Sequence, residues 1–251
     1  MKRVSILGTQ VSCLNYSKTI SIIKQTISHK QVGYVCVAAV HLIMECFDDL
    51  RLQTSINQAL CVTADGMPLV WIQKLLGNSA SRVYGPELTL CLCQYAEKIG
   101  WKVFFVGGST GEGYKMTMEL HKRYPRLAIA GTFDTPVRPL PEKQNYKLVK
   151  QLNITKPELI FVGLGCPLQE RWMINNRPKI RQGVMIGVGA AFDFISKTKR
   201  QAPTWVQSLG FEWFVRLIQD PKRLWKRYTV TNARFILYFL KSTLFTSIRF
   251  K

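Results

Sequence analysis

The 251-residue sequence is poor in acidic residues and in histidine. It has 15 Asp and Glu against 35 Lys and Arg, a formal net charge of +20, and only three His. The seven Cys form no C-x-x-C pair and their number is odd, so we expect neither a disulfide framework nor a zinc site. The sequence therefore predicts a protein of the reducing cytoplasm whose cysteines pack as small core residues.

Long apolar runs are also missing. No segment approaches the ~20 apolar residues of a membrane-spanning helix. The apolar run 235–240 is short and lies between Arg234 and Lys241. The first residues are basic, but no apolar stretch of signal-peptide length follows them. We therefore expect neither a signal peptide nor a transmembrane segment.

The positive charge is concentrated near the C-terminus. Residues 197–251 contain 12 Lys and Arg and 2 Asp and Glu, which is half of the net charge. Such a segment attracts polyanions, namely nucleic acid, anionic lipid or phosphorylated substrates. No zinc-finger, RRM or KH signature is present, which disfavours nucleic acid. Either the interleaved aromatics lie at an anionic lipid surface, or they pack on the core. These aromatics are Trp205, Trp213, Trp225, Tyr228, Phe235 and Tyr238.

Strand-like and helix-like segments alternate along residues 32–194. Short, near-continuous apolar runs are typical of strands buried on both faces of a parallel sheet, and they indicate an α/β layered fold. The expected strands are residues 32–40, 60–62, 103–106, 127–130, 159–162 and 184–186, and the expected helices are 41–59, 86–99, 112–124, 142–154 and 168–176. We predict a catalytic or binding core over residues 1–195 and a basic, aromatic helical appendage over residues 196–251.

Two glycine-rich turns follow predicted strands. Gly107 and Gly108 precede one helix, and Gly163 and Gly165 precede another. Ligands of parallel α/β sheets bind beyond the carboxyl ends of the strands, where small residues let backbone amides approach a phosphate. Either these loops hold a nucleotide diphosphate, or they are plain turns. Neither is a Walker A loop or a G-x-G-x-x-G fingerprint, which disfavours a dinucleotide oxidoreductase.

Charged side chains lie near the same predicted edge. Asp65 follows a strand, so it is either a general base or the cap of the next turn. Glu170 either reaches the ligand or complements a helix dipole. Asp193 either accepts hydrogen bonds from a sugar or pairs with an Arg. Arg82 and Arg138 either bind phosphate or are solvated.

Divalent-metal glycosyltransferases commonly carry an Asp-x-Asp motif, and none is present here. His41 follows a predicted strand, and no metal-binding partners are evident near it. We therefore expect no metal site and no cofactor.

These motifs in their order resemble the WecG/TagA/CpsF family, glycosyltransferase family 26. The matching segments are residues 63–71 (TADGMPLVW), 82–88 (RVYGPEL), 103–108 (VFFVGG), 163–172 (GLGCPLQERW), 187–194 (GVGAAFDF), 201–203 (QAP), 212–213 (EW) and 223–228 (RLWKRY). The resemblance implies a Rossmann-like core and an inverting transfer from a UDP-sugar to a polyprenyl-diphosphate-linked acceptor. It also implies an appendage that docks on the inner face of the membrane and helps to close the active site.

The resemblance assigns roles residue by residue. Asp65 matches the family's general base and Gln169 its active-site glutamine, while the glycine loops and Asp193 match the nucleotide-binding region. Cations of the appendage would meet the acceptor diphosphate. They are Arg216, Arg223 and Arg227.

One position departs from the family pattern. Relatives often carry Asn after the second strand, and this chain has Ala39 there, within residues 37–41 (VAAVH). The change removes a polar contact, so a nucleotide-sugar-binding protein without catalysis stays the alternative. The donor sugar, the acceptor glycan, the pathway (teichoic acid, exopolysaccharide or capsule) and a homo-oligomeric state stay open.

Overall fold

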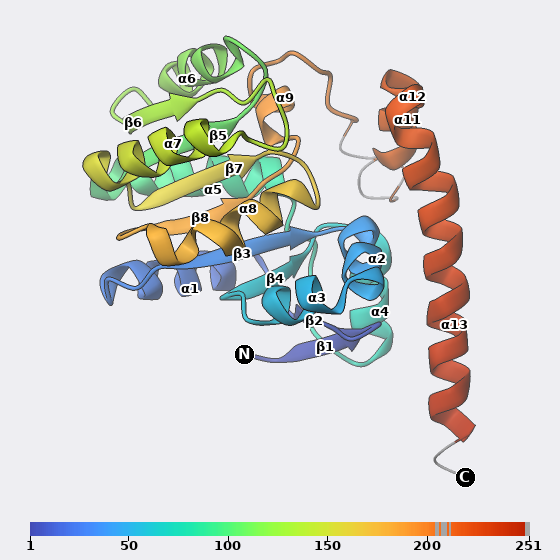
Figure 1. The fold of residues 1–251 in the computed structure, drawn as a ribbon. Helices are drawn as coiled ribbons and strands as arrows, with labels where there is room; N and C mark the ends of the chain where they lie inside the picture. Colours follow the sequence, from blue (N-terminus) through green and yellow to red (C-terminus); the bar gives the residue numbers. More distant parts are fainter. Residues whose placement is uncertain (204–205, 207–209, 211, 249–251) are drawn as a thin grey trace.

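Six parallel strands form the central sheet of the protein, seen here in a computed structural model (Figure 1). The structure describes residues 1–203, 206, 210 and 212–248, and it does not describe the side chains of residues 223, 227 and 243–248. The strand order is β4-β3-β8-β7-β5-β6. The strands are β3 (Gly33–Ala38), β4 (Cys61–Ala64), β5 (Lys102–Gly107), β6 (Ala128–Phe133), β7 (Leu159–Gly163) and β8 (Val184–Gly187). All six predicted strands and the α/β fold class are confirmed.

Helices cover both faces of this sheet. Successive strand residues point to opposite faces, so Phe104 and Val106 pack in one core and Val103 and Phe105 in the other. The first core includes residues of α2 (Val40–Asp48), α3 (Leu50–Asn57), α4 (Met67–Leu75), α7 (Glu142–Thr155) and α8 (Leu168–Asn176). The second includes residues of α1 (Tyr16–Ser28), α5 (Gly85–Ile99), α6 (Glu112–Arg123) and α9 (Ala191–Ile195). A 3-10 turn, η1 (Arg177–Lys179), follows α8.

The predicted single helix over residues 41–59 is wrong. The chain breaks at Asp49, whose extended backbone ends α2 and whose carboxylate accepts hydrogen bonds from the amides of Arg51 and Leu52 at the start of α3. Asp favours such N-cap positions because it satisfies amides that lack a partner in the helix. The antiparallel hairpin of β1 (Arg3–Ile6) and β2 (Thr9–Ser12) was not predicted, nor was α1.

In the part of the C-terminal appendage that the structure describes from residue 212 onward, four helical segments follow one another. They are α11 (Glu212–Gln219), α12 (Pro221–Lys226), the π-helix η2 (Arg227–Thr231) and α13 (Asn232–Ile248). Figure 1 shows α13 as a long column beside α2. The rings of Tyr238 and Phe47 lie 4.7 Å apart, and Arg234 pairs with Asp48 at 2.7 Å. These contacts attach α13 to the core.

The attachment corrects part of the lipid-interface prediction. Phe235 is only 4% exposed and Tyr238 packs on Phe47, so these two aromatics face the core. Trp213 and Trp225 are exposed on the appendage, while Trp205 lies outside the described residues. None of the helices in the described part of the chain combines the length and the apolar character that crossing a membrane requires.

Gly107→Ala is expected to destabilise the fold strongly. Gly107 ends β5 with φ of +136°, and a Cβ there would lie 2.6 Å from the backbone oxygen of Gly163. Strain and overlap together should cost at least about 2 kcal/mol in free energy of unfolding, measured by denaturant titration. Gly100→Ala is the matched control, because Gly100 has φ of +77° with open space around it. Equal losses in both variants would contradict the steric explanation.

Candidate active site

A cavity of about 910 Å³ opens at the carboxyl edge of the sheet. It is lined by residues at or just after the ends of β3, β4, β5, β7 and β8, where ligands of parallel sheets bind. The appendage completes the wall with Arg216, Leu224, Lys226 and Arg234. The cavity brings together several of the predicted site residues: Asp65, Gln169, Gly108, Gly163, Gly165, Asp193 and Arg216.

Asp65 follows β4 directly and is held on one side only. Its amide donates to the backbone oxygen of Ala38 (2.8 Å), which fixes the main chain against β3. Arg82 donates through Nε (3.2 Å) and Nη2 (3.0 Å) to Oδ1, and through Nε to the Asp65 backbone oxygen (2.7 Å). Within the described part of the chain no hydrogen bond reaches Oδ2. One carboxylate oxygen is therefore anchored and the other is left for a ligand.

The surroundings of Asp65 raise the pKa of its carboxyl group towards neutrality. Its side chain is 21% exposed. Burial, opposed by Arg82 and reinforced by the nearby Glu212 carboxylate, raises the pKa of Asp65 to about 6. A carboxylate with such a pKa is a better proton acceptor than an ordinary surface Asp.

A second cavity of about 170 Å³ meets the first at Asp65. The two share Ala39, His41, Asp65 and Arg216. The wall of the second cavity is largely apolar and comes from α4 and α11. It includes Met67, Pro68, Trp71 and Trp213. Asp65 therefore lies where a large cavity and a small one join, which suits a group that acts between two substrates.

Gln169 is fixed by two hydrogen bonds in the first turn of α8. Its Nε2 donates to Glu170 Oε1 (2.7 Å), and its Oε1 accepts from the amide of Gly189 (3.0 Å). Glu170 is fully buried and does not line the cavity. The structure thus places Glu170 behind Gln169, where it orients the glutamine that reaches the ligand space.

The two glycine loops differ in the donors they leave free. In the first loop, the amide of Ser109 donates to Glu112 and the amide of Gly111 to Asp134, so protein carboxylates occupy both. Gly107 packs against Gly163 and does not line the cavity. Gly163 and Gly165 line it directly, after β7. Gly108 and Ser109 of the first loop line the cavity as well. Phosphate contact at either loop stays a prediction.

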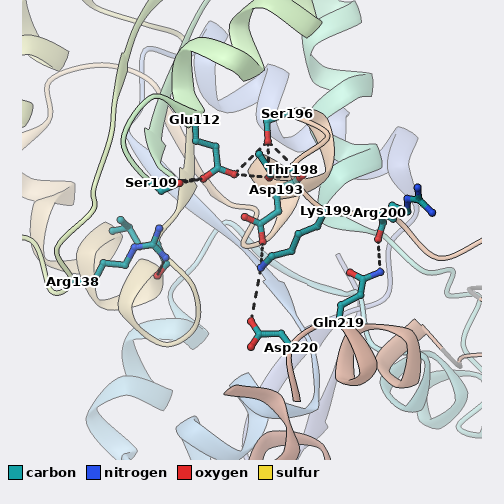
Figure 2. Close-up of polar contacts among 11 residues, drawn as sticks. Ser109, Glu112, Arg138, Asp193, Ser196, Thr198, Lys199, Arg200, Gln219 and Asp220 are labelled. Atoms are coloured by element: carbon teal, nitrogen blue, oxygen red, sulfur yellow. Dashed lines mark hydrogen bonds and ion pairs between the residues drawn. The ribbon is translucent and has the colours of Figure 1, made fainter. Parts of the chain in front are cut away.

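Sequence reasoning missed Glu112, which organises this edge (Figure 2). Its carboxylate accepts from Ser109 Oγ (3.0 Å), Ser196 Oγ (3.3 Å) and Thr198 Oγ1 (3.2 Å). Burial disfavours the ionised form, but hydrogen bonds from the amide and the hydroxyl of Ser109 and from Thr198 hold the pKa of Glu112 below its usual value. The Ser-x-x-Glu spacing of residues 109–112 resembles the sequence pattern of a capping box, but α6 begins only at Glu112 with Gly111 as its N-cap, so the pair is a different contact.

Asp193 pairs with a lysine. Lys199 Nζ lies 2.9 Å from Asp193 Oδ2 and 4.0 Å from Asp220 Oδ2, and Figure 2 shows the lysine between the two carboxylates. Asp220 precedes α12, so the bridge joins the α9 region to the appendage. Asp193 also lines the cavity, which leaves its predicted sugar contact open.

Several cations surround the cavity. Arg216 lines both cavities, and its guanidinium lies 5.8 Å from the centroid of the Phe194 ring. Arg138 lines the large cavity and donates to the backbone oxygen of Leu164 (3.3 Å). The predictions for the side chains of Arg223 and Arg227 lie outside what the structure describes. Arg82 lines the second cavity, where it contacts Asp65.

Ala39 is the position where the resemblance noted in the sequence leads us to expect Asn. It is the N-cap of α2 without a side-chain cap bond, and it lines both cavities beside Asp65. The departure from the family pattern therefore falls within the ligand space.

Comparison with known proteins gives a consistent picture. The glycosyl transferase WecG/TagA/CpsF family matches residues 4–249. Two relatives are N-acetylglucosaminyldiphosphoundecaprenol N-acetyl-beta-D-mannosaminyltransferases. That of Bacillus subtilis (strain 168) is 34% identical over 66% of this chain and 63% of its own length, and that of Staphylococcus aureus (strain MRSA252) is 32% identical over 67% and 65%.

A third relative with the same name, from Bacillus spizizenii (strain ATCC 23059 / NRRL B-14472 / W23), is 27% identical over 78% of this chain and 74% of its own length. The chain thus matches slightly less than two thirds of the length of the first two relatives. Because the family match extends over nearly all of its residues, the chain belongs to the glycosyl transferase WecG/TagA/CpsF family.

Proposed function

We propose that this chain is an inverting glycosyltransferase that moves a sugar from a UDP-sugar onto a polyprenyl-diphosphate-linked acceptor. The observation that carries the proposal is Asp65, anchored through Oδ1 and open at Oδ2, at the junction of the two cavities. The names of the relatives specify N-acetylmannosaminyl transfer to an N-acetylglucosaminyl-diphospho-undecaprenol acceptor. An acceptor of that class would place the product in the synthesis of a cell-surface polysaccharide, such as teichoic acid.

Asp65 acts as the general base in this proposal. Its free oxygen removes the proton from the acceptor hydroxyl while that oxygen attacks the anomeric carbon of the donor. The bond from the anomeric carbon to the phosphate oxygen breaks, and UDP leaves with the bonding electron pair. Attack opposite the leaving group inverts the anomeric configuration.

The donor occupies the large cavity and the acceptor enters from the smaller one. Preorganised donors stabilise charge that develops on a leaving group, and the loop after β7 with Arg138 and Arg216 supplies such groups. Gln169, locked by Glu170 and Gly189, orients the donor sugar. We propose metal independence because the sequence has no Asp-x-Asp motif.

The acceptor is anchored in a lipid bilayer, so the protein must reach the membrane surface. We propose that the appendage binds peripherally to the inner, anionic face through its exposed aromatics and lysines. Apolar rings and cations on one helical segment are the usual combination for such binding. Trp213, Phe214 and Trp225 are exposed there.

UDP release from a panel of UDP-sugars, with and without a polyprenyl-diphosphate-sugar acceptor and in EDTA, tests the function. Acceptor-dependent release from one donor, with UDP-N-acetylmannosamine first in the panel, is the expected result. Release that requires a divalent cation would overturn metal independence alone. No release from any donor, with UDP binding intact, would favour the second candidate below.

The acid limb of the pH profile is expected near pH 6. Asp65 must be ionised to accept a proton, and its pKa is raised to about 6, mainly by burial. Below that pH, kcat/KM should fall about tenfold per unit, and above it a plateau should follow. Initial rates between pH 4 and 8 measure the limb. A limb near pH 4 would show that an ordinary carboxyl group is titrating.

The second candidate is a nucleotide-sugar-binding protein without transfer activity. Ala39 favours it, because an apolar methyl group lines both cavities where relatives often carry a polar side chain. Ala39→Asn distinguishes the two candidates. Appearance of transfer in this variant alone would identify the native chain as the binding form.

A further inference from the structure

A chain of ionic contacts links the appendage to Asp65. Arg82 Nη2 lies 3.0 Å from Asp65 Oδ1 and 2.5 Å from Oε2 of Glu212, the first residue of α11. The side chain of Glu212 is 8% exposed and that of Arg82 is 20% exposed. Arg82 also stacks over the ring of Tyr84, at 4.3 Å from its centroid. The guanidinium is therefore fixed by three neighbours.

The position of Glu212 decides how Arg82 meets Asp65. An arginine facing a lone carboxylate tends to bind both oxygens at once through its parallel N–H groups. Here Nη2 is shared with Glu212, and Arg82 reaches only Oδ1 of Asp65. Without Glu212, the guanidinium can rotate to take both oxygens. The oxygen that faces the ligand would then be engaged.

We propose that Glu212 is a positioning residue for Asp65: by holding Arg82 it keeps one oxygen of the base free, so that the active geometry exists only while the appendage is seated. The proposal rests on the proposed function for its kinetic part, whereas the arrangement itself can be tested without turnover. In this proposal the appendage orients the general base directly, through the carboxylate of Glu212, which no local sequence motif singles out.

Other charged or titratable groups surround Asp65, and a pH experiment must distinguish their effects from that of Glu212. His41 of α2 lines both cavities and pairs with Glu45 at 3.6 Å. Further groups in the described part of the chain include Arg216 of α11, Tyr84 before α5, Tyr16 of α1 and Tyr228 of η2. A limb set by His41 would respond to Glu45→Gln, whereas a limb set by Asp65 would not.

Glu212→Gln in the full-length protein is the central variant. Gln keeps the shape and removes the charge that helps to raise the pKa of Asp65. We expect kcat to fall about tenfold, within the range of a positioning defect. We also expect the acid limb to move to lower pH by up to about one unit, the lower end of a neighbouring-charge effect. Asp220→Asn, which removes another carboxylate of the appendage, should leave the limb in place.

A double-mutant cycle with Arg82→Gln tests whether Glu212 acts through Arg82. Residues in one network are non-additive, so Glu212→Gln should cost less than about twofold in kcat, or improve it, once Arg82 is absent. A structural role of Glu212 in seating α11 that does not involve Arg82 would lower kcat by the same factor in both backgrounds. That additivity would overturn the proposal.

Carbon-13 NMR of Asp side chains, with the Asp65 signal assigned through Asp65→Asn, gives a readout that needs no turnover. The Asp65 carboxyl should titrate at lower pH in Glu212→Gln than in the native protein. An unchanged Asp65 titration would overturn the proposal. A shifted titration in a protein that transfers no sugar would uphold the ionic arrangement and refute the transferase function, so the two failures are distinguishable.

Discussion

Replacing Asp65 by Asn is expected to lower the turnover of sugar transfer by about 10²–10⁴-fold, the usual size of a general-base effect. Asn can replace Asp65 without loss of its contacts, because Arg82 binds only Oδ1 and the backbone oxygen of Asp65. An Asn whose oxygen takes the Oδ1 position keeps these hydrogen bonds. Only the oxygen that would accept the proton is exchanged, for an amide nitrogen that cannot accept it.

A radiolabelled transfer assay at saturating donor measures this loss, and UDP binding by calorimetry checks that the nucleotide site is intact. Asp193→Asn is the matched control, since it removes a carboxylate from the same cavity. Because Asp193 is predicted to contact the donor in this cavity, its replacement should raise the KM for the donor more than it lowers kcat. Near-normal turnover by Asp65→Asn would remove Asp65 from the role of base.

Neutralising three exposed lysines of the appendage, Lys222→Gln with Lys226→Gln and Lys241→Gln, is expected to weaken binding to anionic vesicles by about 100-fold. Each cation near an anionic surface contributes about 1 kcal/mol. These lysines are exposed along the appendage. Co-sedimentation with vesicles that contain anionic lipid, at a fixed ionic strength, measures the change.

A matched triple variant separates position from net charge. Lys143, Lys147 and Lys150 are exposed on α7, which lies far from α13 in Figure 1. Their replacement by Gln lowers the net charge equally and should leave vesicle binding almost unchanged. Equal weakening by both triple variants would show that overall charge attracts the protein to lipid, and would contradict a membrane-facing appendage.

Much of the fold was predictable because local patterns encode it. Strands buried on both faces need continuous apolar runs, such as residues 159–162 and 184–186, and the structure has strands there. Helix ends were harder to predict. A single apolar period runs across residues 41–59, and only the extended backbone at Asp49 separates α2 from α3. The hairpin of β1 and β2 has short strands whose signal is weak.

Some residues of the candidate site could also be predicted from the sequence, and others could not. Asp65 and Gly163 could be placed near the site from sequence because strand ends of a parallel sheet converge on one edge, while the roles of Asp65 and Gln169 came from the family resemblance. Their partners could not be named. Glu170 was expected either at the ligand or at a helix dipole, and only packing placed it behind Gln169.

By itself, the sequence determined the parallel α/β core, the carboxyl edge as the place of the site, and the basic appendage, because apolar periodicity, glycine turns and charge are properties of short segments. Only the tertiary structure decided that Arg82 joins Asp65 to Glu212, which lies 130 residues further along the chain than Arg82, and that Phe235 and Tyr238 face the core. Ion pairs and ring contacts between distant segments depend on how helices dock in space, and no local pattern records that docking.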